Sequence, residues 1–350
     1  MAVDSLKKIL VRAPNWIGDA VMCLPTVESL KALYPTAEIT VLTKSRAVPV
    51  FRHNPAVKDI IEYDDRARHS GIKGRIVLSG EIRERRFDLA VLFQNAFDAA
   101  FIAYISRIPK RAGYARDLRT KLLTMPVPAT KEIRSRHQVY YYLNIVKALG
   151  GTIPDSPVPR IYIAEDEKAW AEEFLRKNGL DKKVLIGAAP GASYGPAKRW
   201  LPEHFAEVLK DFSSRHDAVP IIFGGVEDAE ICKTVSDQVP GKHLNLAGSV
   251  DLRQFMAILS YLKVFITNDS GPMHVSCALG VPTVAIFGST DPDLTGPLGE
   301  HVRVIIKKVD CSPCFEREYL YNDFRCLTSI KPEEVLRQAE SLLAKGGERR

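Results

Sequence analysis

No stretch of this sequence is apolar for long enough to cross a bilayer, because no apolar run approaches the roughly 18 residues that a spanning helix requires. The first residues also lack the apolar core of a secretory signal peptide, since Arg12 and Pro14 interrupt the segment. These two absences argue against a membrane-spanning or secreted protein. We therefore expect the chain to reside in the cytoplasm.

The glycine fingerprint of dinucleotide-binding enzymes is missing as well. The turn at 14–18 and the loop at 191–198 follow the first predicted strand of each half, and neither reads G-x-G-x-x-G. An enzyme that uses NAD is therefore not expected.

Cysteine is scarce, and its six positions fall into two groups. Three of them lie in apolar, periodic segments, where a thiol acts as a small core residue: Cys23, Cys232 and Cys277. Cys311 and Cys314 form a C-x2-C pair with Cys326 further on, but no fourth cysteine is present and no histidine follows to complete a zinc site. We expect reduced cysteines packed in a loop, with zinc as the alternative.

What the sequence does hold is an ordinary soluble composition, with 46% hydrophobic and 26% charged residues in 350 positions. That length predicts two domains, each large enough to bury a core. Residues 1–150 hold 25 Lys and Arg against 14 Asp and Glu, a net charge of +11, whereas the other 200 residues carry −4. The first half is predicted to face nucleic acid, an anionic membrane surface or a phosphorylated substrate, unless it is simply a solvated basic surface.

Apolar strands alternate with helical segments along both halves, which predicts doubly wound α/β domains. The pattern begins with a strand at 7–13 and a helix at 19–33 that Pro25 is expected to kink. Residues 150–160 carry two glycines and three prolines without periodicity, which is typical of a linker. Later predicted elements include a charged loop at 64–75 and helices at 76–86 and 134–149. We expect domains at 1–155 and 156–330, with a C-terminal helix and tail at 331–350.

The stretch Val264–Gly288 carries the clearest functional pattern. A short β-rich run is broken by turn formers from Asn268, Pro272 stands at the first helical position, and a second apolar strand follows. Such a βαβ unit binds ligands at the carboxyl ends of its strands, and the free N–H groups that start its helix attract phosphate. The alternative is that Asp269 or Ser270 only caps the helix.

Four motifs follow one another along the chain: RAPNWIGDAVMCLP at 12–25, PGASYGPAKRWLPEHFAE at 190–207, FGGVE at 223–227 and NDSGPMHVSCALGVPTVAIFGSTDP at 268–292. Their order and spacing, across about residues 5–330, resemble the ADP-heptose:lipopolysaccharide heptosyltransferases of glycosyltransferase family 9. Within that family, the NWIGD opening and the CSPC segment are most similar to heptosyltransferase II. Relatives often carry another cysteine where Tyr319 and Tyr321 stand here.

The resemblance implies a GT-B architecture, in which two Rossmann-like, doubly wound α/β domains face each other across a cleft. The first would bind the acceptor and the second the ADP-sugar. It also implies an inverting transfer of L-glycero-D-manno-heptose from the substrate ADP-heptose onto heptose I of the lipopolysaccharide inner core, without a metal or other cofactor.

The partner implied by the resemblance is a phosphorylated Kdo-lipid A core acceptor at the cytoplasmic face of the inner membrane. A monomer would bind there peripherally, and no nucleic acid is implied. Two alternatives stay open. One is heptosyltransferase I or III with another inner-core acceptor, and the other is a non-catalytic module that binds a nucleotide or an acidic lipid.

Inverting transfer needs a base for the acceptor hydroxyl and positive groups for the departing diphosphate. The resemblance places the family's catalytic base at Asp19, just after Gly18, although locally this residue could simply stabilise a helix N-terminus. It places the diphosphate-binding lysine at Lys198, in a loop of small residues where an ammonium can reach a phosphate. Arg199 beside it either shares the task or faces solvent.

The remaining donor contacts also come from the resemblance. Glu227 follows a Gly-Gly turn, where a carboxylate can accept hydrogen bonds from both ribose hydroxyls, although Asp228 is locally as good a candidate. His274 is alternatively a core histidine. The expected donor-binding residues are Gly18, Ser193, Lys198, Glu227, Asp269, Ser270, Gly271, Met273 and His274.

Acceptor binding is expected from basic residues of the first half. The candidates are Arg66, Arg68, Lys73, Arg116 and Arg119. Asp291 and Asp293 form a D-x-D sequence, the metal signature of other glycosyltransferases, but Pro292 between them fits a turn. We interpret this motif as structural.

Overall fold

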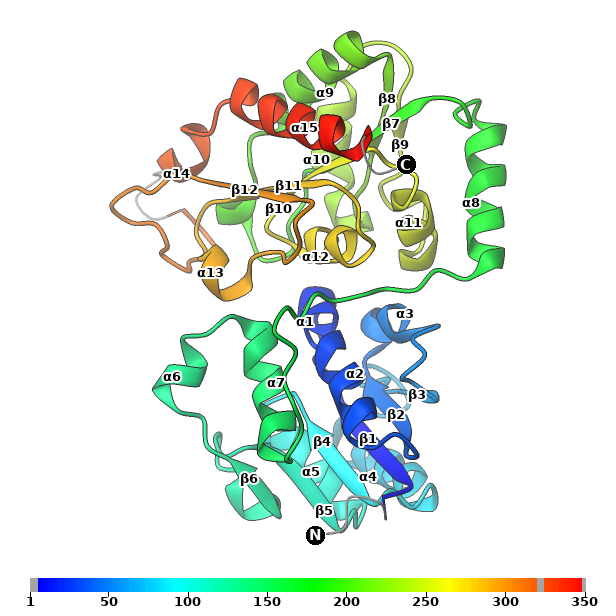
Figure 1. Cartoon of the computed structure of the whole chain (residues 1–350), viewed down its shortest axis with the longest axis vertical. Helices are drawn as coiled ribbons and strands as arrows, with labels where there is room; N and C mark the ends of the chain where they lie inside the picture. Colours follow the sequence, from blue (N-terminus) through cyan, green and yellow to red (C-terminus); the bar gives the residue numbers. More distant parts are fainter. Residues whose placement is uncertain (1–5, 320–323, 348–350) are drawn as a thin grey trace. The chain divides into compact units, whose positions relative to one another are not determined.

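The computed structural model describes residues 6–319 and 324–347, and the chain divides into two compact units, Met1–Tyr162 and Ile163–Arg350. Each unit is built on a six-stranded sheet whose paired strands are all parallel, with helices in most of the connections between strands (Figure 1). Among the described residues, no helix is both long and apolar enough to span a bilayer.

The first unit holds the elements drawn from blue to green in Figure 1. Its strands are β1 (Lys8–Arg12), β2 (Glu38–Thr43), β3 (Asp59–Glu62), β4 (Leu89–Leu92), β5 (Lys110–Tyr114) and β6 (Met125–Val127). Its helices are α1 (Ile17–Met22), α2 (Leu24–Leu33), α3 (Val48–Phe51), α4 (Gly71–Glu84), α5 (Phe97–Ile105), α6 (Lys131–Arg134) and α7 (Gln138–Ala148), with 3-10 turns η2 (Ser45–Ala47) and η3 (Thr120–Leu122).

Three predicted boundaries in this unit differ from the structure. The helix expected at 19–33 is broken at Cys23, because Pro25 stands at the start of α2, where its missing N–H costs nothing. The loop expected at 64–75 turns into α4 earlier, and a Cβ on Gly74 would lie 2.1 Å from the His69 backbone. The helix expected at 134–149 starts later, at Gln138 of α7, because His137 caps it there, and the separate short helix α6 ends at Arg134.

The second unit runs from green to red in Figure 1. Its strands are β7 (Val184–Ala189), β8 (Ala218–Ile222), β9 (Leu244–Asn245), β10 (Val264–Asn268), β11 (Thr283–Phe287) and β12 (Val302–Ile306). Its helices are α8 (Glu165–Lys177), α9 (Pro202–His216), α10 (Ala229–Ser236), α11 (Leu252–Leu259), α12 (Gly271–Ala278), α13 (Pro292–Thr295), α14 (Arg325–Thr328) and α15 (Pro332–Gly347), with 3-10 turns η4 (Pro196–Lys198) and η5 (Val226–Asp228).

Both sheets have the same strand order, with the first strand of each unit lying beside the fourth. The orders are β3-β2-β1-β4-β5-β6 and β12-β11-β10-β7-β8-β9. The chain therefore winds outward in opposite directions from β1 and from β7, and ligands bind outside the carboxyl ends of the strands at such a reversal. Because every strand pair is parallel, the segments that leave the strands gather along one edge of each sheet.

The cores consist of the strands and the helix faces that cover them. In the second unit, Trp200, Phe205 and Phe212 are fully buried, and α15 adds Val335 and Ala339 to the same cluster. The three cysteines predicted as core residues are buried: Cys23, Cys232 and Cys277. The candidate functional residues are therefore sought at the carboxyl edges of the sheets, where ligands of such folds bind.

Candidate active site

A buried ion pair joins the segments that follow β7 and β10, the two strands at the reversal of the second sheet. Lys198, at the end of η4, places Nζ 2.5 Å from Oδ2 of Asp269, the residue directly after β10. The Lys198 side chain is 13% exposed and that of Asp269 is 4% exposed. The hydroxyl of Thr290, which follows β11, donates to the same carboxylate. The predicted residues Lys198 and Asp269 thus meet at the reversal.

Asn268, the last residue of β10, fixes the loop that carries Lys198. Its fully buried amide donates to the Pro190 carbonyl at 2.7 Å and accepts from the Trp200 backbone N–H at 2.9 Å. These two residues are the ends of the loop, so both ends are fastened to β10. The position of the ammonium is therefore set by the strand and not by the loop alone.

Within this loop, the aromatic ring of Tyr194 lies beside two cations. Lys198 Nζ is 4.6 Å from the ring centroid, and the Arg317 guanidinium is 5.2 Å from it. Arg199 turns back to donate to the Ala192 carbonyl, so it stabilises the loop. Ser193 is exposed. The loop therefore presents the Lys198 charge and a hydroxyl from one short segment.

The start of α12 is not capped by a side chain. Ser270 occupies the N-cap position without accepting a capping hydrogen bond, and Asp269 pairs with Lys198 instead. The capping alternative for these two residues is therefore wrong. Gly271 begins the helix, while Met273 and His274 are buried within it.

The turn after β8 separates the roles of its two carboxylates. Asp228 accepts from the Gly225 N–H at 3.1 Å and packs against Gly191, where a Cβ would lie 2.2 Å from the Asp228 carboxyl carbon. Gly191 thus allows the loop after β7 to approach this turn. Glu227 is exposed in η5. Of the two candidates, Asp228 holds the turn and Glu227 is accessible to a ligand.

In the first unit, Asp19 lies in the first turn of α1, after Gly18 and beyond the carboxyl end of β1. The Tyr142 hydroxyl, from α7, donates to Asp19 Oδ1 at 3.3 Å. Burial raises the pKa of Tyr142 well above its usual value, and the nearby Asp19 charge raises it further. Burial, reinforced by Asp19, also raises the pKa of the Cys23 thiol. Both neighbours therefore stay protonated at neutral pH.

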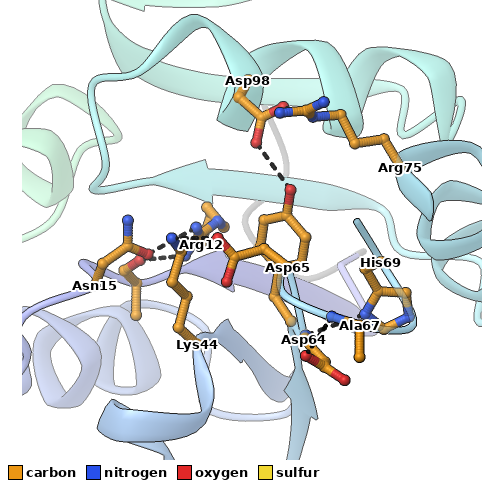
Figure 2. Close-up of polar contacts among 11 residues, drawn as sticks. Arg12, Asn15, Lys44, Asp64, Asp65, Ala67, His69, Arg75 and Asp98 are labelled. Carbon is orange, nitrogen blue, oxygen red and sulfur yellow. Dashed lines mark hydrogen bonds and ion pairs between the residues drawn. The ribbon is translucent and has the colours of Figure 1, made fainter. Parts of the chain in front are cut away.

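The segment between β1 and α1 is held by Arg12, the last residue of β1. Arg12 is 2% exposed, and its guanidinium donates to the Asn15 side chain at 2.9 Å, as Figure 2 shows. The Tyr63 ring lies 5.4 Å from the guanidinium carbon. Burial lowers the pKa of Arg12 to about 10, an effect that the nearby Tyr63, Asp98 and Asp65 partly offset. Arg12 therefore keeps its charge and anchors the approach to Asp19.

Ion pairs surround Arg12 at the same edge of the sheet (Figure 2). Lys44, after β2, lies 2.6 Å from Asp65, after β3. Arg75 of α4 pairs with Asp98 of α5, which also accepts from the Tyr63 hydroxyl at 3.2 Å. Part of the positive charge of this half is thus compensated within the unit.

Four of the five predicted acceptor contacts are accessible along this edge. Arg66, Arg68 and Lys73 are exposed after β3, and Arg68 reaches Glu81 at 2.6 Å. Arg116 is exposed after β5. These side chains follow strands of the sheet that carries Asp19 at the end of β1.

Arg119 does not share that position, because its side chain is fully buried. Its guanidinium donates to the backbone carbonyls of Tyr114 and Gln94 and, at 3.2 Å, to the side chain of Asn95. Burial lowers the pKa of Arg119 to about 10. The residue ties together the ends of β4 and β5, so we remove it from the surface expected to meet the acceptor.

The two motifs that suggested metal ligands are placed as follows. Asp291 caps α13 by accepting from the Asp293 N–H at 2.9 Å, the structural role predicted for this motif. Cys326 is buried in the core, Cys311 and Cys314 are half-buried, and Tyr321 lies outside the described residues. Within the described part of the chain, no three His, Cys, Asp or Glu side chains are grouped as ligands of a metal ion.

Comparison with known proteins identifies the family. The model of glycosyltransferase family 9 (heptosyltransferase) matches residues 75–324. Lipopolysaccharide heptosyltransferase 2 of Salmonella typhimurium is 31% identical over 350 residues, which cover 97% of this chain and 99% of that protein. The chain belongs to glycosyltransferase family 9.

Solved structures confirm the fold of this family 9 enzyme. The structure of Escherichia coli ADP-heptose lps heptosyltransferase II has a TM-score of 0.84 and 30% identity, covering 97% of this chain and 99% of that one. A family 9 glycosyltransferase from Veillonella parvula has a TM-score of 0.89 and 28% identity, covering 99% of both chains. The predicted GT-B type fold with two Rossmann-like sheets is confirmed, and so is the assignment to the glycosyltransferases.

Three side chains of this family 9 chain that contact the proposed site residues were not predicted from the sequence: Asn268, Thr290 and Tyr142. Asn268 and Thr290 stand inside a motif already recognised, but nothing local indicates that they hold Lys198 and Asp269. Tyr142 is 123 residues away from Asp19, and only the packing of α7 brings it there.

We expect Asn268→Leu to destabilise the second unit, because the buried Trp200 N–H and Pro190 carbonyl both lose their partner. Each unmet group costs about 1–3 kcal/mol, so urea denaturation should show a loss of about 2–6 kcal/mol in the free energy of unfolding. Asn245→Ala is the matched control, since Asn245 is an exposed residue at the end of β9 with one side-chain bond to Ala247. Equal effects of the two substitutions would contradict the anchoring role of Asn268.

Proposed function

We propose that this chain is an inverting heptosyltransferase that moves L-glycero-D-manno-heptose from ADP-heptose onto the first heptose of the lipopolysaccharide inner core. The observation that carries the proposal is the full-length similarity to lipopolysaccharide heptosyltransferase 2, which extends across both units at 31% identity. The broader activity, heptose transfer in lipopolysaccharide core synthesis, rests on the same relative and on the family match.

The donor is proposed to bind at the carboxyl edge of the second sheet. Lys198 and the uncapped start of α12 supply the positive groups for the diphosphate, with Ser193 as a further donor. Glu227 accepts from the ribose hydroxyls. When the glycosidic bond to phosphate breaks, negative charge grows on ADP, and a fixed ammonium stabilises that charge more than it stabilises the bound substrate.

Asp19 is proposed as the general base. It takes the proton of the acceptor hydroxyl while that oxygen forms a bond to the anomeric carbon of heptose. The bond between this carbon and the phosphate oxygen breaks in the same displacement, its electron pair leaves with ADP, and the anomeric configuration inverts. A carboxylate held by Tyr142 in the first turn of α1 suits this task.

The acceptor is proposed to meet the first unit, whose exposed cations match a phosphorylated Kdo-lipid A core. Arg66, Arg68, Lys73 and Arg116 supply the charge. Large apolar side chains are exposed on the neighbouring helices α4 and α5, including Ile72 at 73%, Ile76 at 60%, Phe97 at 48% and Tyr104 at 50%. Cations beside apolar side chains favour the interface of an anionic bilayer, which supports peripheral binding at the cytoplasmic face of the inner membrane.

An acceptor series tests the proposed function directly. The purified chain is incubated with ADP-heptose and core acceptors that carry zero, one or two heptoses, and the products are detected by mass. We expect transfer onto the one-heptose acceptor, with KM rising as salt screens the cations and with better use in anionic than in neutral vesicles. Preferred transfer onto the other acceptors would support heptosyltransferase I or III, and no transfer would support a binding module.

Replacing the proposed donor contacts should separate catalysis from nucleotide binding. Lys198→Ala is expected to lower kcat by about a hundredfold and to weaken ADP binding, because leaving-group charge is no longer stabilised. Glu227→Ala should mainly weaken ADP binding, as calorimetry will show. The controls are Lys183→Ala, a lysine paired with Asp217 at the amino end of β7, and Glu230→Ala on the exposed face of α10. Wild-type ADP affinity in both test variants would remove the donor assignment.

Asp19→Asn should abolish proton transfer from the acceptor hydroxyl while preserving the size and shape of the side chain. A general base contributes about 10²–10⁴ in rate, so we expect kcat to fall at least about a hundredfold. The melting temperature and ADP affinity should match those of the unaltered chain. A loss of less than tenfold in a folded variant that binds ADP would place the base elsewhere.

A further inference from the structure

The hydrogen bond from Tyr142 to Asp19 joins two helices of the first unit that are far apart in the sequence. Tyr142 is 4% exposed and lies among apolar and aromatic side chains, with the Phe93 ring centroid 5.7 Å and the Tyr141 ring centroid 6.1 Å from its own. A buried hydroxyl must find a partner, and here the partner is Asp19 Oδ1 at 3.3 Å.

The direction of this bond is fixed by the chemistry of its acceptor. An ionised carboxylate only accepts hydrogen bonds and a hydroxyl has one proton to give, so the Tyr142 proton is directed to the Asp19 carboxylate. Gln138, one helical turn before Tyr142 in α7, also contacts this hydroxyl and lowers the pKa of Tyr142, against the larger upward effects of burial and Asp19.

Several groups on the elements packed against α1 have partners or surroundings of their own. At the junction of α1 and α2, the Cys23 thiol donates to the Ala20 carbonyl at 3.1 Å. From η2, the Arg46 guanidinium lies over the Trp16 ring at 4.9 Å. The short helix α3 contributes the apolar residues Val48 to Phe51.

We propose that Tyr142 is a positioning residue for the reaction: its hydroxyl holds the Asp19 carboxylate in one rotamer and stabilises its ionised form. The inference rests on the proposed function for the catalytic meaning of Asp19, but the coupling between the two side chains can be measured without activity. The Tyr142 hydroxyl bonds the proposed base, so its effect on the reaction is transmitted through Asp19.

Two consequences follow for the carboxylate. A hydrogen bond to the charged form favours ionisation, so removing it raises the pKa of the acid. A carboxylate with one oxygen held also loses less freedom when it meets the acceptor hydroxyl, and a misplaced base costs rate even where binding is unchanged. Tyr142→Phe should therefore alter the acid limb of the pH profile and kcat, with little effect on KM.

The direct test follows the Asp19 carboxyl carbon by NMR in the full chain labelled with ¹³C-aspartate. The signal is assigned by its loss in Asp19→Asn. In Tyr142→Phe we expect the titration midpoint of Asp19 to move up by about one pH unit, the size expected for one hydrogen bond to a charged group. An unchanged midpoint would overturn the proposal.

Tyr114→Phe is the matched control. Tyr114 is also fully buried in the first unit, and its hydroxyl donates to the Tyr141 carbonyl at 2.6 Å. Losing this hydroxyl removes a buried hydrogen bond without touching Asp19, so the Asp19 midpoint should stay in place. A shift equal to that of Tyr142→Phe would mean that general loosening of the unit, and not the direct bond, sets the midpoint.

Gln138→Leu keeps the phenol and tests the orientation of its proton. We expect a smaller upward shift of the Asp19 midpoint, because the Tyr142 proton then has more freedom to turn away. This variant also covers the case in which Tyr142→Phe does not fold. A Gln138→Leu midpoint identical to that of the unaltered chain would argue against the oriented hydroxyl.

Kinetics then separates this inference from the proposed function. With Asp19 as the base, Tyr142→Phe should lower kcat by about tenfold, leave both KM values near those of the unaltered chain, and move the acid limb of kcat by the same amount as the NMR midpoint. A shifted midpoint with an unshifted pH–rate profile would keep the Tyr142–Asp19 coupling and remove Asp19 as the base. If Tyr142→Phe leaves the Asp19 midpoint unshifted while Asp19→Asn is inactive, Asp19 stays the base and the Tyr142–Asp19 coupling is removed.

Discussion

The parallel pairing of the first and fourth strands in each unit is the constraint on which both sites depend. β1 lies beside β4 and β7 beside β10, so the segments leaving these strands meet at one edge. In the second unit this geometry brings Lys198 to Asp269. In the first unit, Arg12 at the end of β1 bonds Asn15 in the segment that enters α1. Neither arrangement requires an unusual loop conformation, because the strand order already places these segments at the same edge of the sheet.

Three buried cations show how the protein uses different side chains for different tasks. Arg12 and Arg119 use the fixed fork of the guanidinium to satisfy several oxygen acceptors at once, which ties strand ends together. Lys198 carries a compact charge on a flexible stem, balanced by the Asp269 carboxylate. An ammonium of this kind can keep its partner and still contact a phosphate, whereas the two guanidinium groups are committed to the fold.

The strands and helices could largely be predicted from the sequence, since apolar runs such as 283–287 are buried on both faces of a parallel sheet. The predicted boundaries were wrong where a helix starts or ends although the hydrophobic pattern continues. The split at Cys23 and the early start of α4 at Gly71 are such cases. The strands β6 and β12 were not predicted, because they lie at the edges of their sheets and are less uniformly apolar.

The sequence by itself determined the family, the two α/β units and the chemical character of Asp19, Lys198 and Asp269, because motifs and hydrophobic periodicity are local properties. Only the tertiary structure decided that Arg119 is buried and that Tyr142 reaches Asp19. A count of basic residues cannot distinguish a surface charge from one that binds carbonyls inside the fold. Contacts between residues 123 positions apart arise from helix packing on the sheet, which no local pattern encodes.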